Sequence, residues 1–274
     1  MNFMSPCDLP RLWRPVAVLL LAVLCAPAIA APLCNGPIRF ALYENGYLYD
    51  ASTERGIDKD VALELERRSG CRFEFVVRPR ARIWHDLEVG AVAMTGSAVA
   101  TAERRHFAHF VTYMTQKNFV VVHRAVPARS AAEFFAGSEA RWGAVRGYRH
   151  GVRADQYLET LRRAGRLAEA ADIGEVFRLF ARGRTAALLA PPATYARYLG
   201  EVLDPGRVRI EDWFPADLPI PHALAFSRQH FSEEAIEGWR RMLRQMREDG
   251  SLRNIYAHYL GSEDAARLLA FTPD

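Results

Sequence analysis

Apolar residues occur along the chain in two kinds of pattern, which take turns from one segment to the next. Some form short continuous runs that are typical of buried strands, and others recur at the spacing of an amphipathic helix. The clearest stripe, Ile236, Trp239, Leu243 and Met246, predicts a helix over 233–248 that Ser232 caps. The runs predict strands at 38–43, 73–77, 92–95, 117–123, 142–145, 185–189 and 222–227. Further helices are predicted at 59–68, 83–89, 153–164, 174–182, 191–199 and 252–259.

Strand and helix signals alternate through most of the chain, in two similar successions. Such alternation is typical of a mainly parallel sheet with helices on its faces, which is the α/β class. Half of the residues are apolar, which is enough for a large core in one domain or in two lobes.

The N-terminus carries the features of an export signal. Arg11 and Arg14 precede an apolar run, Val16–Cys25, and the small residues Ala28 and Ala30 follow it. This order predicts a signal peptide over 1–30 and a protein delivered to the periplasm. The apolar run is short for a bilayer span, so an uncleaved anchor is the weaker interpretation.

Two cysteines follow the predicted signal peptide. Cys34 lies just before the first strand and Cys71 just before the second. In a strand–helix–strand unit both strand starts lie at one edge of the sheet, and exported thiols usually pair. We therefore predict a Cys34–Cys71 disulfide. Neither cysteine has metal-ligand spacing with a histidine, so no metal site is expected.

Charge and motifs narrow the function. The formal net charge is +4 with no basic run among aromatics, which argues against nucleic acid as a partner. The glycine turn at 143–147 lacks the Lys-Ser/Thr of a phosphate loop, and no cofactor is expected.

The stretch Thr95–Phe110 reads as strand, turn and helix start. Thr101 is the predicted N-cap, with Glu103 and Arg104 in the first turn. Taken alone, this stretch is also compatible with an ordinary capped surface helix.

In context, the chain resembles the family 3 extracytoplasmic solute-binding proteins, the periplasmic receptors of polar amino acid ABC transporters. The resemblance covers about 36–261 and rests on several weak motifs that occur in family order. They are Gly56-Ile57-Asp58-x-Asp60, Trp84-x-x-Leu87-x-x-Gly90, Thr101-x-Glu103-Arg104, Gly143-x-Val145-x-Gly147, Gly183-Arg184-x-Ala186 and Asp249-Gly250-Ser251-x-x-x-Ile255-Tyr256.

The resemblance implies a two-lobed, type II periplasmic binding protein fold with a ligand cleft between lobes. Lobe 1 would comprise 31–121 and a return part, 223–261, followed by a tail, 262–274. Lobe 2 would comprise 122–222, with hinge strands near 120–124 and 219–223. Its partners would be a small solute and an ABC permease in the inner membrane, and the protein would act as a monomer.

The resemblance also implies the ligand-binding residues. Arg104 matches the arginine that binds an amino acid α-carboxylate in the family, and Tyr43 or Tyr47 matches an aromatic packed on the ligand. Arg146 and Tyr148 fall in the glycine turn of the second lobe. The full expected set is Arg104, Arg80, Arg82, Tyr43, Glu44, Tyr47, Gly96, Ser97, Arg146 and Tyr148.

Two positions depart from the family pattern. Val99 replaces a hydroxyl residue, and Ala190 stands where the family usually has the aspartate that holds an ammonium. An ammonium buried without a carboxylate would be costly, so the surplus of arginines predicts a small organic anion. The other interpretation is that the arginines around 78–82 are solvated and that Glu44, Asp58 or Asp172 serves an amino acid ligand.

Two other roles are compatible with the same fold. One is a periplasmic enzyme similar to cyclohexadienyl dehydratase, for which Glu44 and His150 are the acid–base candidates. The other is a ligand-sensing partner of a membrane receptor. A binding protein is the expectation, because the sequence offers no nucleophile–base pair and no paired carboxylates.

Overall fold

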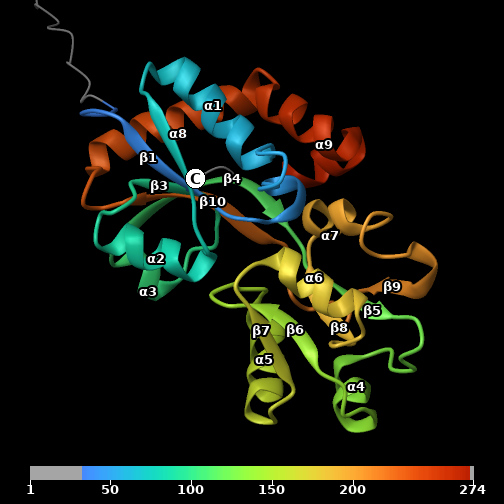
Figure 1. The fold of residues 1–274 in the computed structure, drawn as a ribbon. Coiled ribbons are helices and arrows are strands. Elements are labelled where there is room, and N and C mark those ends of the chain that lie inside the picture. Colours follow the sequence, from blue (N-terminus) through green and yellow to red (C-terminus); the bar gives the residue numbers. More distant parts are fainter. Residues whose placement is uncertain (1–32, 272–274) are drawn as a thin grey trace, which may run out of the picture. The chain divides into compact units, whose positions relative to one another are not determined.

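The computed structural model describes residues 33–271 (Figure 1). The predicted signal peptide, 1–30, lies outside them. Among the described residues, no helix combines the length and apolar character needed to cross a membrane. The strands form two five-stranded sheets, which confirms the α/β class.

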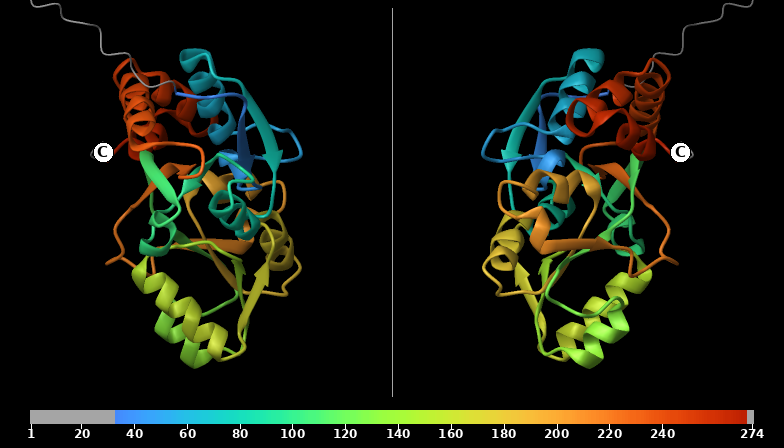
Figure 2. Two further views of the ribbon diagram at one scale, coloured as in Figure 1. Left: turned by 90° about the vertical axis from the view of Figure 1, so that its left-hand side faces the viewer. Right: turned by 90° about the vertical axis from the view of Figure 1, so that its right-hand side faces the viewer.

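The first sheet has the strand order β2-β1-β3-β10-β4. Strand β1 is parallel to β2 and β3, whereas β10 runs antiparallel to β3 and β4. Although β10 is far from β4 in sequence, the two strands lie side by side (Figures 1 and 2). The strand bounds are β1 Ile38–Leu42, β2 Phe73–Val77, β3 Met94–Ala98, β4 Ala108–Gln116 and β10 Ile220–Ser227.

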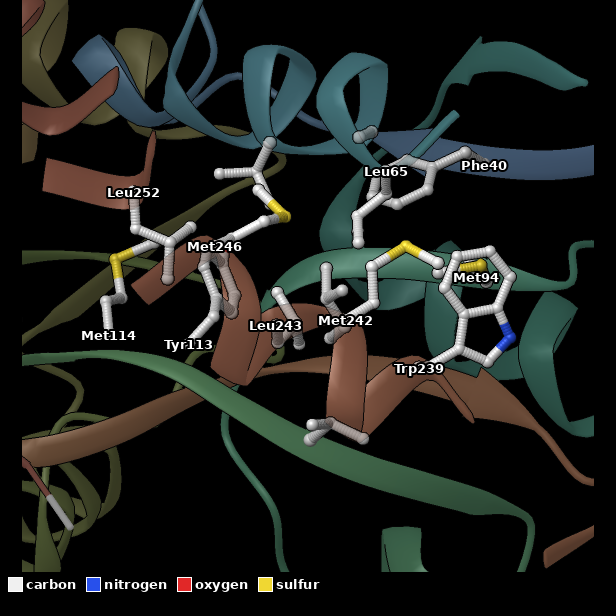
Figure 3. Packing of buried hydrophobic residues seen from close by; sticks show 14 of the residues in the cluster. Phe40, Leu65, Met94, Tyr113, Met114, Trp239, Met242, Leu243, Met246 and Leu252 are labelled. Carbon is white, nitrogen blue, oxygen red and sulfur yellow. The ribbon is translucent and has the colours of Figure 1, made fainter. Parts of the chain in front are cut away.

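Helices cover both faces of this sheet because its strands alternate apolar residues between two cores. Phe40 packs in a cluster with residues of α1, α8 and α9, and Ala41 packs with residues of α2. Figure 3 shows the first cluster, where Trp239 and Met246 of α8 lie near Phe40 and Tyr113 respectively. The helix bounds are α1 Ile57–Ser69, α2 Arg80–Glu88, α3 Ala102–Arg105, α8 Glu233–Glu248 and α9 Ser251–Leu268, with a 3-10 turn η1 at Gly46–Leu48.

The second sheet repeats this plan with the order β7-β6-β8-β5-β9. Here β6 is parallel to β7 and β8, and β5 is antiparallel to β8 and β9. Its strands are β5 Phe119–His123, β6 Trp142–Val145, β7 Leu167–Ala170, β8 Ala187–Ala190 and β9 Val208–Glu211. Its helical segments are α4 Ala131–Gly137, α5 Val152–Arg163, α6 Ile173–Ala181, α7 Pro192–Tyr198 and the 3-10 turn η2 Pro205–Arg207.

We use lobe 1 for the first sheet with α1–α3, α8 and α9, and lobe 2 for the second sheet with α4–α7. The chain passes from the first sheet to the second between Gln116 and Phe119, and returns between Glu211 and Ile220. The predicted domain limits at 121 and 222, and the hinge role of these crossings, stay predictions.

The predicted disulfide between Cys34 and Cys71 is formed, with 6.1 Å between the two Cα atoms.

Helix α8 also has its predicted bounds, and the Ser232 side chain accepts a hydrogen bond from the backbone of Ala235.

Three secondary-structure expectations need correction. The helix predicted to follow Thr101 is a single turn, because the chain enters the buried strand β4 at Ala108. Strand β3 extends to Ala98 rather than ending at Thr95. The backbone of α9 leaves the helical conformation at Gly261 (φ +79°, ψ 170°), as predicted, but the tail expected after it is a second helical stretch that runs to Leu268, which is buried against the lobe 1 core.

Candidate functional site

A small cavity lies where segments of both lobes meet. Its volume is about 30 Å³, which leaves room for little more than water. Most lining residues follow the carboxyl ends of parallel strands, the usual position of ligands in open α/β sheets. The lining residues are Tyr43, Asn45, Arg80, Ser97, Val99, Arg104, Asn118, Gly147, Tyr148, Arg149, His150, Pro191 and His222.

Arg80, the first residue of α2, is 3% exposed. Its guanidinium carbon lies 4.4 Å from the ring centre of Tyr43 and 4.2 Å from that of Trp84. Nη2 donates a hydrogen bond to the carbonyl of Ser97 at 3.1 Å, and Nη1 donates longer hydrogen bonds to the Gly96 carbonyl and the Thr95 hydroxyl. Aromatic faces and carbonyl oxygens therefore hold a buried cation in place.

Arg104, in the single turn α3, is 6% exposed and contacts both lobes. Nη1 donates to the carbonyl of Val99 and Nη2 to that of Gly147 in lobe 2, each at 2.8 Å. The guanidinium carbon lies 3.7 Å from the ring centre of Trp84. Burial, followed by repulsion from Arg80, lowers the pKa of Arg104 to about 9.

The backbone beside Arg80 is shaped by a buried acid. The Asp58 carboxylate accepts hydrogen bonds from the hydroxyls of Ser97 and Tyr113. A Cβ at Gly96 would lie 2.7 Å from that carboxylate, so this position needs glycine. Burial raises the pKa of Asp58 to about 6, although both hydroxyls and Arg80 oppose the rise.

Lobe 2 contributes a turn between β6 and α5. Gly147 has a φ of +82°, and its carbonyl accepts the bond from Arg104. The Tyr148 ring packs edge-on against Tyr43 at 5.8 Å, and its hydroxyl donates to the Glu44 carbonyl at 3.4 Å. These contacts join the two lobes around the cavity.

Two histidines, His150 and His222, line the cavity and are buried. Burial and the neighbouring Arg149 lower the pKa of His150 to about 4. Burial, with Arg80 and His150 nearby, lowers the pKa of His222 to about 3. Both imidazoles are therefore neutral near pH 7.

Half of the predicted ligand-binding residues line this cavity, namely Tyr43, Arg80, Ser97, Arg104 and Tyr148. The sequence did not indicate binding roles for Asn45, Asn118, Arg149 or His222. Asn118 and His222 lie near the crossings between the lobes, where only the three-dimensional path of the chain brings them to the cavity. Binding roles for all of these residues stay predictions.

The other predicted residues lie elsewhere. Arg82 is exposed and pairs with Asp86, because it is two positions from Arg80 on one helix and points to another side. Arg146 is exposed. Tyr47 packs toward Tyr259 of α9 at 6.2 Å.

Gly96 and Glu44 support the site from behind the cavity wall. Gly96 contacts Asp58, as described above. The Glu44 carboxylate accepts hydrogen bonds from the backbone of Gly46 and Ala51 and from the hydroxyl of Tyr198 in α7. Glu44 therefore links η1 to lobe 2 instead of facing the cavity.

The cavity combines strong positive charge with no acidic lining. Within residues 33–271, neither Arg80 nor Arg104 has a carboxylate at ion-pair distance, in contrast to the Arg82–Asp86 pair. Ala190, at the position of the family aspartate, is 1% exposed and brings no charge, and the next residue, Pro191, lines the cavity. Guanidinium groups of this kind can bind an anion through charge-assisted hydrogen bonds.

The two sheets with their flanking helices form the two-lobed fold of periplasmic binding proteins. The structure is similar to an ancestral arginine-binding protein bound to glutamine (TM-score 0.68, 20% identity, 82% of this chain and 98% of that one). It is also similar to the arginine-, lysine-, histidine-binding protein ArtJ from Geobacillus stearothermophilus (TM-score 0.66, 14% identity, 82% and 95%). A third similar structure is the ancestral amino acid-binding protein AncCDT-1, a precursor of cyclohexadienyl dehydratase (TM-score 0.65, 20% identity, 82% and 96%).

The family model for bacterial extracellular solute-binding proteins, family 3, matches residues 40–262. The chain belongs to this family, as its sequence motifs predict. No curated protein matches the chain.

Proposed function

We propose that this protein binds a small organic anion in the cavity between its lobes and delivers it to an ABC permease in the inner membrane. It would act as a monomer in the periplasm. The family match supports a solute-binding role. The observation that carries the anionic specificity is the pair of buried guanidinium groups, Arg80 and Arg104, without a carboxylate partner.

The free energy of burial supports this specificity. Carbonyl oxygens and aromatic rings hold both guanidinium groups but carry no net negative charge, and a bound anion would supply the opposite charge that both arginines lack. An amino acid would add an ammonium group, for which the cavity offers no acidic side chain. The strongest ligands should therefore lack an ammonium group.

Binding also requires the lobes to separate. At about 30 Å³ the cavity is smaller than any organic acid, and the Arg104–Gly147 bond crosses it between lobes. The solute would enter an open form, and its carboxylate would replace Gly147 as the partner of Arg104. Closure would follow because the ligand binds the closed form better.

The test is thermal unfolding with a panel of monocarboxylates, dicarboxylates and amino acids, using wild type, Arg104→Met and Arg105→Met. A ligand that binds the native state raises the melting temperature. Organic acids should stabilise the wild type and Arg105→Met, whose changed residue is exposed in the same turn, but not Arg104→Met. Stabilisation by amino acids alone would refute the proposed specificity.

An enzyme on the same fold is the alternative, because His150 lines the cavity and one similar structure is a dehydratase precursor. The imidazole of His150 is neutral near pH 7 and could accept a proton. Incubation with prephenate distinguishes the roles: consumption of prephenate would establish catalysis, whereas stabilisation without consumption supports binding.

A further inference from the structure

His222 is a buried polar residue that lines the cavity and has an unused hydrogen-bonding atom. It belongs to β10, where the pairing with β4 shifts register between His222 and Ala223. The side chain is 8% exposed and lines the cavity, and its Nδ1 is buried without a hydrogen-bond partner among residues 33–271. A buried nitrogen of this kind costs free energy unless a ligand or water engages it.

The groups around His222 are mostly basic or neutral. Arg80 of α2 and His150 of the β6–α5 turn interact with it electrostatically, and each disfavours its protonated form. Its partner in the ladder with β4 is the apolar Met114. The neutral imidazole can donate one N–H to an anion, which would lie beside Arg80 as well.

The charge at the cavity comes mainly from two buried arginines. Arg80 and Arg104 line it and are buried, Arg149 lines it but is exposed to solvent, and none of the lining residues is acidic. Asp58, behind Ser97, offsets part of the charge of Arg80. The two buried guanidinium groups therefore offer one position each for an anionic group.

The two buried guanidinium groups are close neighbours. Their carbon atoms lie 4.2 and 3.7 Å from the ring centre of the same residue, Trp84. The two guanidinium carbons are therefore at most about 8 Å apart. A short molecule with an anionic group at each end can span this distance.

We propose that Arg80 and His222 form a second anionic subsite beside Arg104, and that the solute is a short dicarboxylate. One carboxylate binds Arg104, and the other binds Arg80 and accepts a hydrogen bond from His222. This inference rests on the proposed function, because it names the class of anion that the same cavity takes.

The test is calorimetric titration with malonate, succinate and glutarate, compared with acetate, propionate and butyrate. At least one dicarboxylate should bind more than tenfold tighter than every monocarboxylate. His222→Ala should weaken dicarboxylate binding about tenfold or more, the value of a hydrogen bond to a charged group, and weaken monocarboxylate binding less, because a monocarboxylate can bind Arg104 alone. His222→Asn, with an amide N–H near the place of Nδ1, should restore part of the selectivity.

His85→Ala is the matched control, because His85 is exposed on α2 and should not affect either class of ligand. Should His222→Ala fail to fold, the wild-type selectivity and His222→Asn still decide. Equal affinity for mono- and dicarboxylates, or unchanged selectivity in His222→Ala, would overturn the second subsite while the proposed function stands. Binding of amino acids alone, with no response to any organic acid, would refute the proposed function itself.

Discussion

Trp84 should determine how well the two buried arginines are prepared for a ligand. Its indole ring contacts both guanidinium groups, at 4.2 Å for Arg80 and 3.7 Å for Arg104. In Trp84→Leu both aromatic contacts are lost while an apolar side chain remains in the core. Each arginine would then gain rotamers that do not face the cavity.

The expected magnitude follows from the number of side chains that lose support. A ligand must immobilise each freed arginine on binding, at a cost of about 0.5–1.5 kcal/mol per side chain. For two arginines the affinity should fall by about 1–3 kcal/mol, or roughly 5- to 150-fold. Trp84→Phe keeps an aromatic face and should lose less.

The assay is calorimetric titration of the wild type and both variants with the strongest organic acid of the panel. Urea unfolding must first show that each variant is folded, because Trp84 is buried and its replacement also leaves a cavity in the core. An affinity within twofold of the wild type in folded Trp84→Leu would refute the idea that Trp84 preorganises the arginines.

Three further predictions concern stability and the cavity wall. Replacing Cys34 and Cys71 by serine removes a disulfide between residues separated by 37 positions. Urea unfolding should show that the free energy of unfolding falls by about 4 kcal/mol, and a decrease below 1 kcal/mol would contradict this prediction. Asp58 has a folded-state pKa of about 6, above its unfolded value near 4, so ionisation in the fold costs stability as pH rises from 4 to 6. In the wild type the unfolding free energy should fall by on the order of 2 kcal/mol between those pH values, and Asp58→Asn should remove this decline. The same pH dependence in both proteins would argue against it. Arg80→Lys should weaken ligand binding in calorimetry because lysine lacks the planar guanidinium group, whereas Arg82→Lys, at an exposed position, should not. Equal affinities of the two variants would contradict a binding role that is specific to Arg80.

The sequence predicts those elements in which local signals agree with the tertiary structure. Helix α8 has a serine cap, a clear apolar stripe and the predicted bounds. The disulfide follows from two cysteines placed before neighbouring parallel strands. Strand β4 was missed because it is buried on nearly every position, so its apolar residues show no alternation after the helical turn at Thr101.

The candidate site is less accessible from sequence, because it depends on side-chain directions. Arg80 and Arg82 look equivalent in a predicted loop, but α2 begins at Arg80 and turns the two side chains to different sides. His222 faces the cavity where β10 changes its register with β4, a feature without a sequence signature. Gly96 is needed because Asp58, distant in sequence, packs against it.

The most direct test of the anionic cavity is a calorimetric comparison of succinate with aspartate, two short diacids that differ by one ammonium group. With Arg80 and Arg104 in the cavity and no acid among its lining residues, succinate should bind more tightly than aspartate. Tighter binding of aspartate would show that the protein provides for an ammonium group, and it would contradict the account of this cavity as a site for organic anions.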